Sequence, residues 1–201
     1  MRTVIVSNIV SLDGFYAAPN GSPLVLNMDE AFDEYNRERI EAADIVLLGR
    51  NSFEGFSAYW PNVANAPADP GNRALSENNR RISSAYNSLC KVVVSDNLKI
   101  SPDNPWAKST TVIPRTATAA WLEAAQNEGD RDILIFASRI MWNGLLSRDL
   151  IDELHLMVSP AALVEGVPIF DVPASLNLMD SRRFPNSNNV LLRYSTRGHL
   201  T

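Results

Sequence analysis

The segment at residues 44–54 combines residue types that together can bind phosphate. Its first part, DIVLL, predicts a short buried strand, because four consecutive residues are apolar. Gly49 then ends the strand, and Ser52 is expected to cap a following helix. A helix start offers backbone N–H groups without partners, and Arg50 adds a planar, permanently charged guanidinium. The pattern predicts an anion site, with an ordinary turn and a solvated arginine as the alternative.

Asp13 is the candidate for handling a substrate or a proton. Residues 3–10 are mostly β-branched or apolar, which predicts a first strand, and the chain then enters a loop marked by Asp-Gly and Pro-Asn-Gly turns. A carboxylate on such a loop could orient a substrate or relay a proton through water. It could equally bond the backbone of its own turn.

Two further strand ends carry polar residues. Ser95 and Asp96 follow the apolar run VVV, and Ser138 and Arg139 follow the run ILIF one residue later. Ser138 is expected to cap the next helix, and Arg139 either pairs with phosphate or is exposed to solvent. Because the carboxyl ends of parallel strands meet at one edge of a sheet, these residues are expected to share a cleft with residues 49–52.

Five segments, in this order, resemble the dihydrofolate reductase superfamily, in the bacterial branch related to the reductase domain of riboflavin biosynthesis. The likeness runs from about residue 4 to residue 170. The segments are SLDGF (11–15), GRNSFE (49–54, where relatives carry Gly-Arg-Lys-Thr-Tyr-Glu), ASR (137–139, where relatives carry Gly-Ser), LIDEL (150–154), and the loop VEG (164–166, at a Gly-x-Gly of the relatives).

The resemblance implies an α/β fold with a mixed, mostly parallel central sheet, flanking helices and an antiparallel C-terminal hairpin. It implies an NADPH-dependent reductase of a small pterin- or pyrimidine-type heterocycle, similar to the 5-amino-6-(5-phosphoribosylamino)uracil reductase of riboflavin biosynthesis. Asp13 is the implied catalytic residue. The implied cofactor-binding residues are Gly49, Arg50, Asn51, Ser52, Ser95, Asp96, Ala137, Ser138, Arg139 and Gly166.

Several positions leave alternatives open. Ala137 and Val164 stand where relatives carry glycine, and each side chain could weaken cofactor binding by overpacking. A non-catalytic or specialised nucleotide-binding protein is therefore the alternative function. An inward Asp96 would repel the 2′-phosphate of NADPH and suit a bare ribose. Asp33 is a second candidate carboxylate, because dihydrofolate reductases carry their catalytic carboxylate on the corresponding helix.

Composition excludes several classes of function. The chain has 201 residues, 45% of them hydrophobic and 20% charged, which predicts one globular domain over residues 1–201. A net charge of −5 argues against a nucleic-acid surface, and no apolar run could span a membrane. Cys90 is the only cysteine, and His155 and His199 are far apart, so no disulfide or metal site is expected. A cytoplasmic homodimer is expected, the dimer by resemblance.

Three local patterns predict element ends and burial. Asn27 and Glu30 have the spacing of a capping box at the start of the first helix. An aromatic helix that starts near Phe53 is expected to end at Pro61. Cys90 is expected to be a small buried residue beside a strand.

Overall fold

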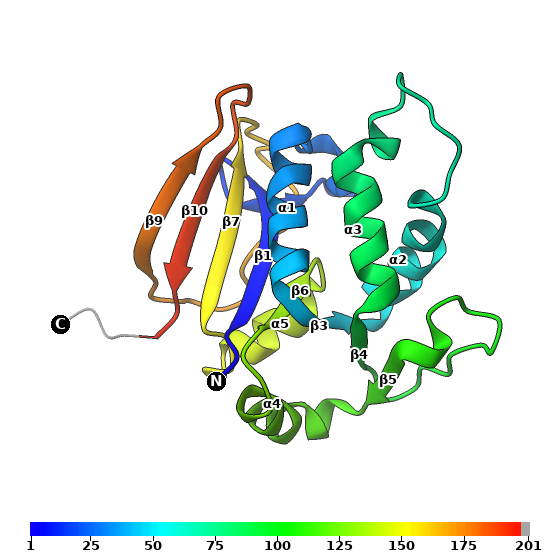
Figure 1. Ribbon diagram of the computed structural model, residues 1–201. Coiled ribbons are helices and arrows are strands. Elements are labelled where there is room, and N and C mark those ends of the chain that lie inside the picture. Colours follow the sequence, from blue (N-terminus) through cyan, green and yellow to red (C-terminus); the bar gives the residue numbers. More distant parts are fainter. Residues whose placement is uncertain (198–201) are drawn as a thin grey trace.

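The computed structural model describes residues 1–197, so His199 lies outside the described part. This part forms a sheet in the order β5-β4-β3-β6-β1-β7-β10-β9 (Figure 1). Neighbours from β5 to β7 are parallel, whereas β10 is antiparallel to β7 and β9. The mixed, mostly parallel sheet with an antiparallel end is thereby confirmed. The strands are β1 (Val4–Ser11), β3 (Ala43–Gly49), β4 (Cys90–Val94), β5 (Thr110–Ile113), β6 (Asp132–Phe136), β7 (Glu153–Ser159), β9 (Asn177–Arg183) and β10 (Val190–Ser195).

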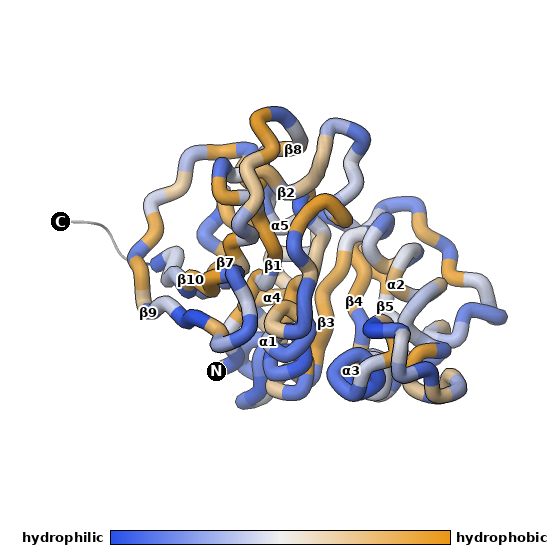
Figure 2. Tube along the Cα trace, turned by 90° about the horizontal axis from the view of Figure 1, so that it is seen from above, coloured by the Kyte–Doolittle hydropathy of each residue, from blue (hydrophilic) through white to orange (hydrophobic). Residues whose placement is uncertain are grey.

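Helices cover both faces of the sheet. The helices are α1 (Glu30–Ala42), α2 (Arg50–Val63), α3 (Glu77–Ser88), α4 (Thr118–Asn127) and α5 (Arg139–Leu146). Successive strand residues point to opposite faces, so Val46 and Leu48 of β3 pack in the cluster that α1, α2 and α3 cover. Ile45 and Leu47 pack in the cluster that α4 and α5 cover. Figure 2 shows β3 as hydrophobic along its length, beside the largely hydrophilic α1 and α3.

Short elements lie over the carboxyl edge of the parallel strands. β2 (Phe15–Ala17) and β8 (Val167–Pro168) form a separate two-stranded antiparallel sheet. The remaining elements of the described part are single 3₁₀ turns: η1 (Pro23–Val25), η2 (Arg73–Leu75), η3 (Ala107–Ser109) and η4 (Arg115–Ala117). Among residues 1–197, no helix is long and apolar enough to cross a membrane.

The expected capping box and the expected burial of Cys90 are both wrong. The N-cap of α1 is Asp29, whose carboxylate accepts hydrogen bonds from two N–H groups of the first turn, so Asn27 and Glu30 form no capping box. Asn27 instead donates to the Asp29 carboxylate. Cys90 is exposed, because it is the first residue of β4 and precedes the buried part of the strand.

Pro61 does not end α2, which continues to Val63. Pro61 has no N–H to donate to the carbonyl four residues back, so α2 loses one hydrogen bond at that position. Side chains of α3 also satisfy carbonyl groups there: Ser83 donates to Trp60 and Asn87 donates to Pro61. The expected end of the helix was therefore wrong because of tertiary contacts.

Candidate cofactor cleft

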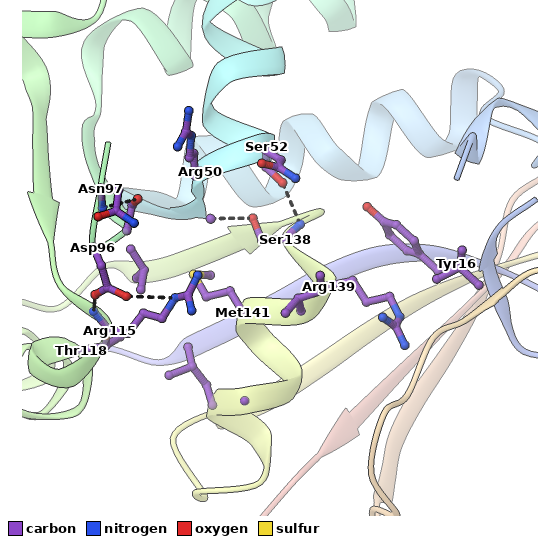
Figure 3. A pocket seen from close by; sticks show the side chains of 18 of the residues that line it. Tyr16, Arg50, Ser52, Asp96, Asn97, Arg115, Thr118, Ser138, Arg139 and Met141 are labelled. Carbon is purple, nitrogen blue, oxygen red and sulfur yellow. Dashed lines mark hydrogen bonds and ion pairs between the residues drawn. The ribbon is translucent and has the colours of Figure 1, made fainter. Parts of the chain in front are cut away.

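A cleft of about 780 Å³ lies at the carboxyl ends of β3, β4 and β6. The starts of α2 and α5, the turn after β4 and the strands β2 and β8 line it (Figure 3). Three predicted residues, Asp13, Ala137 and Gly166, do not line it. The predicted residues that line it are Gly49, Arg50, Asn51, Ser52, Ser95, Asp96, Ser138 and Arg139.

The N-terminus of α2 opens into this cleft. The N-cap is Gly49 rather than Ser52, and it supplies no side-chain capping bond. The N–H groups of the first helical turn, at residues 50–52, have no intrahelical acceptor, and the helix dipole makes this end positive. α2 has 14 residues, long enough for a substantial dipole. The arrangement is suited to bind an anion.

Neither the backbone angle nor crowding requires a glycine at position 49. Its φ is −77°, which any residue adopts. A Cβ there would make only ordinary contacts, 3.7 Å from Met141 Cβ and 3.9 Å from the Ser138 side chain. The missing side chain leaves open the approach to the N–H groups at the start of α2.

Ser138 links the two strand ends that flank the cleft. The N–H of Gly49 donates to Ser138 Oγ at 3.0 Å, and the N–H of Ser138 donates to Ser52 Oγ at 3.0 Å. Ser138 precedes α5 as predicted, but it makes no side-chain capping bond to that helix. Its hydroxyl instead fixes the start of α2 against the start of α5.

Ala137 and Ser138 both adopt left-handed backbone conformations, with φ of +47° and +52°. Non-glycine residues in this region cost on the order of 1 kcal/mol each. The backbone conformation is one that favours glycine, which the resemblance implies at position 137. The Ala137 methyl group does not line the cleft, so it does not narrow it.

Arg50 lines the cleft but forms an ion pair within its own helix. Its Nε lies 2.9 Å from Glu54 Oε1, and both side chains are about half exposed. Figure 3 shows the side chain pointing along α2, away from Ser138. An exposed i,i+4 pair is worth only about 0.3–0.5 kcal/mol, so this contact does not hold the guanidinium firmly.

The far end of the cleft carries a charge pair that joins the turns after β4 and β5. Asp96 accepts a hydrogen bond from the Arg115 N–H at 2.9 Å, and its other oxygen lies 3.5 Å from Arg115 Nε. Ser95 Oγ accepts from the N–H groups of Asn97 and Leu98 and so fixes the turn. Arg115 places a cation beside Asp96, which offsets the repulsion that this carboxylate would exert on a phosphate.

Arg115 and Arg148 also line the cleft, and neither was predicted as a site residue. Each is an isolated basic residue just beyond the end of β5 or α5, which is the usual pattern of a solvated surface arginine. Only the fold brings them to the cleft. With Arg50 and Arg139 they make the lining positive in a chain whose net charge is −5.

The sequence left two possibilities for Arg139: a pair with phosphate, or exposure to solvent. In the structure its guanidinium is bound to other residues of the protein and is largely buried. Its side chain is 11% exposed, and its guanidinium donates to the Pro168 carbonyl and pairs with Asp171. Arg139 therefore fastens the β8 segment to α5.

Asp13 anchors a loop. Its carboxylate accepts hydrogen bonds from Ser11 Oγ at 2.6 Å and from the N–H groups of Leu163 at 3.1 Å and Val164 at 2.7 Å. The Ser11 hydroxyl and the backbone donors lower the pKa of Asp13 to about 2. The catalytic role of Asp13 stays a prediction, and its oxygens are occupied by the loop.

The loop that Asp13 holds contains the two remaining glycine positions of the resemblance. Gly166 is required by packing, because a Cβ there would overlap the carbonyl oxygen of Ala17 in β2. Val164 is left-handed, with φ of +67°, and 86% exposed. Its side chain does not line the cleft, so it does not obstruct a ligand there.

Asp33 lies on α1 and is buried, but it does not line the cleft. Its carboxylate pairs with Arg73 and accepts a hydrogen bond from Asn79 Nδ2 at 2.9 Å. Burial raises the pKa of Asp33, although Arg73 and Asn79 oppose the shift. These partners join α1 to the start of α3. Within residues 1–197, no group of three or more acidic, His or Cys side chains is placed to hold a metal ion.

A family model described as the RibD C-terminal domain matches residues 2–190. The chain belongs to the RibD C-terminal domain family. The uncharacterised protein YyaP of Bacillus subtilis (strain 168) is 25% identical over 201 residues, which cover 98% of this chain and 96% of that protein. The family was expected from the sequence, and the match confirms it.

Solved structures show the same fold at low sequence identity. A putative riboflavin biosynthesis protein from Shewanella sp. PV-4 matches with a TM-score of 0.64 at 20% identity, over 98% of this chain and 99% of that one. The Thermotoga maritima diaminohydroxyphosphoribosylaminopyrimidine deaminase/5-amino-6-(5-phosphoribosylamino)uracil reductase matches with a TM-score of 0.65 at 13% identity, over 98% of this chain and 57% of that one. Enterococcus faecalis dihydrofolate reductase, complexed with NADP(H), matches with a TM-score of 0.60 at 12% identity, over 98% of this chain and 97% of that one. The RibD C-terminal family fold is thus also dihydrofolate reductase-like.

Proposed function

We propose that this protein is an NADPH-dependent reductase of a small heterocyclic substrate of the pterin or pyrimidine type. One observation carries the proposal. The start of α2, where Gly49 provides no side chain to cap the free N–H groups, lines the same cleft as Arg115 and Arg148, although the net charge of the chain is negative. Membership in the RibD C-terminal family and the likeness to a uracil reductase support the same reaction class.

The cleft residues fit a phosphorylated dinucleotide. The N–H groups of Arg50, Asn51 and Ser52 would hold the diphosphate, because they have no intrahelical acceptor and point out of the positive end of α2. Arg115 would pair with the 2′-phosphate, and Asp96 orients it. The cleft volume of about 780 Å³ accommodates a molecule of this size.

NADPH, when bound, supplies a hydride to the substrate. The protein's part is to hold both molecules in line and to exclude water from the reacting atoms. Residues 50–52 would hold the diphosphate, and Arg115 would hold the adenosine end with its 2′-phosphate. The remaining arm of the cofactor would then reach the end beside β2 and β8, where the substrate would be reduced.

The alternative, a nucleotide-binding protein without activity, was motivated by Ala137 and Val164. Neither side chain lines the cleft. The reason for expecting a weakened cofactor site therefore falls away, and reduction is the better proposal.

Binding of NADPH and NADH by the wild-type protein and by Arg115→Ala tests the proposal. Each Kd is measured by tryptophan fluorescence or calorimetry. A charged hydrogen bond contributes about 1.5–3 kcal/mol, and Arg115 is largely exposed, so the low end applies: about a tenfold weaker NADPH affinity. NADH affinity should not change. Lys108→Ala is the matched control, because Lys108 is exposed in η3 outside the cleft and its loss changes the net charge equally.

Two results would contradict the proposal. Absence of saturable NADPH binding at millimolar concentration would remove the reductase function. Equal weakening of NADPH and NADH by Arg115→Ala would place Arg115 at the diphosphate instead of the 2′-phosphate.

We also propose that the protein forms a homodimer through the outer end of its sheet. β9 is an edge strand of the described sheet, and its residues Leu178 and Met179 are 58% and 47% exposed. An edge strand with exposed apolar residues is prone to pair with another chain. Sedimentation should show a dimer that Leu178→Glu converts to a monomer; a monomeric wild type would refute this.

A further inference from the structure

Tyr16 occupies the end of the cleft beside β2 and β8 because of an irregularity in β2. Phe15 pairs with Pro168 and Ala17 pairs with Val167, so the register shifts and Tyr16 is the extra residue. Bulges of this kind are frequent beside active sites, where they redirect one side chain. Figure 3 shows the Tyr16 ring entering the space between Ser52 and Arg139, with its hydroxyl toward the start of α2.

Three contacts hold the strand pair that presents Tyr16. Gly166 allows β2 and the loop before β8 to approach closely, since any Cβ would overlap the Ala17 carbonyl. Arg139 binds the Pro168 carbonyl. Asn143 of α5 donates to the Ile169 carbonyl at 3.0 Å. The phenol is thus positioned by packed elements on both sides, as a group with a chemical role requires.

Among the ionisable side chains of this lining, Tyr16 is the one whose neutral form still carries a proton to donate at neutral pH. The ionisable side chains of the lining are Tyr16, Arg50, Asp96, Arg115, Arg139 and Arg148. Arginines stay charged, and Asp96 is paired with Arg115 at the far end. Asp13 has a pKa of about 2, so it carries no proton at neutral pH. Burial raises the pKa of Tyr16, which therefore keeps its proton.

Arg139 favours loss of the proton from the Tyr16 hydroxyl during reaction. Its positive charge acts against the effect of burial on the pKa of Tyr16. A tyrosinate formed during reaction would lie beside this cation, which Asp171 and the Pro168 carbonyl fix in place. Preorganised charge of this kind stabilises developing anions.

We propose that the Tyr16 hydroxyl donates the proton that completes reduction of the substrate, at the end of the cleft opposite Arg115. The proposal rests on the proposed reductase function. A hydride that adds to the carbon of a C=N or C=O bond leaves an electron pair on the heteroatom. The Tyr16 O–H bond breaks, the proton forms a new N–H or O–H bond on that atom, and the tyrosinate regains a proton from water.

The first test locates Tyr16 without turnover. Protein labelled with ¹³C at tyrosine Cζ is saturated either with NADP⁺ or with 2′-phospho-ADP-ribose, which lacks the nicotinamide ring. The Tyr16 signal is identified by its loss in Tyr16→Phe, and Tyr59, exposed and outside the cleft, serves as the reference. NADP⁺ should shift the Tyr16 signal, and 2′-phospho-ADP-ribose should leave it in place.

The second test measures NADPH oxidation with 5-amino-6-(5-phosphoribosylamino)uracil as the probe substrate. Tyr16→Phe keeps the ring, so NADPH affinity should stay within about twofold, while the rate should fall by about 100-fold or more, the usual contribution of a general acid. Tyr59→Phe should react like the wild type.

The outcomes separate the two proposals. Lack of binding by both nucleotides overturns the reductase function and Tyr16 with it. Binding of both with equal Tyr16 shifts, or with none, overturns only the role of Tyr16, as does a wild-type rate in Tyr16→Phe. The labelled-tyrosine measurement decides the placement of Tyr16 even where the uracil is not turned over.

Discussion

Gly49→Ala should separate cofactor binding from folding. The added methyl group would lie beside the N–H groups at the start of α2, where the account places the diphosphate of NADPH. In the free protein it meets Met141 and Ser138 only at 3.7 and 3.9 Å, which are ordinary contacts. The substitution should therefore affect the ligand and spare the fold.

For Gly49→Ala, the change in the free energy of unfolding is the sum of two opposing effects, and the change in NADPH affinity comes from a third. Alanine at a compatible φ stabilises by about 0.4–1 kcal/mol through the unfolded chain. Alanine is a poorer N-cap than glycine by a similar amount, so the free energy of unfolding should change by less than about 0.5 kcal/mol. Overpacking against the diphosphate costs about 1–3 kcal/mol, which corresponds to an NADPH Kd raised about 5- to 150-fold.

Urea denaturation and calorimetric titration measure the two effects. Gly55→Ala is the matched control, because Gly55 lies in α2 with no atom near its Cβ position. It should raise the free energy of unfolding by about 0.5–1 kcal/mol and leave NADPH binding unchanged. Wild-type affinity in Gly49→Ala would refute the placement of the diphosphate. Strong destabilisation would refute the reasoning about packing.

Two further predictions concern stability. Val164→Gly should raise the free energy of unfolding by about 1–2 kcal/mol, because the β-branched residue has a φ of +67° and an exposed side chain. NADPH affinity should not change; lower stability in denaturant would contradict the inferred strain. Burial lowers the pKa of His155 below its ordinary value of 6.5, so the unfolded chain binds the proton more readily. The free energy of unfolding should be greatest above pH 6.5 and fall as pH decreases below it; a flat profile between pH 5.5 and 7.5 in urea denaturation would contradict this.

The arrangement of the sheet could be predicted from sequence because its signals are local and mutually consistent. DIVLL, VVV and ILIF are strands that helices cover on both faces, and such strands read as continuous apolar runs. Their polar ends meet at one edge, as parallel strands require. Eight of the predicted cofactor residues line the cleft for that reason.

The errors arose where a tertiary contact outweighed a local preference. Ser52 is a good N-cap in isolation, but its hydroxyl accepts the Ser138 N–H from another strand end, and the helix begins earlier. The contact of Asp13 with a loop 150 residues away is likewise visible only in the fold, and its catalytic role stays a prediction. Arg115 and Tyr16 could not be found from sequence. One is an isolated surface-type arginine, and the other depends on a register shift.

The most direct test of the central claim is a crystal structure of the protein with NADP⁺. We expect diphosphate oxygens within hydrogen-bonding distance of the N–H groups of Asn51 and Ser52, with the 2′-phosphate beside Arg115. A diphosphate bound elsewhere, with the start of α2 contacting only water, would contradict it.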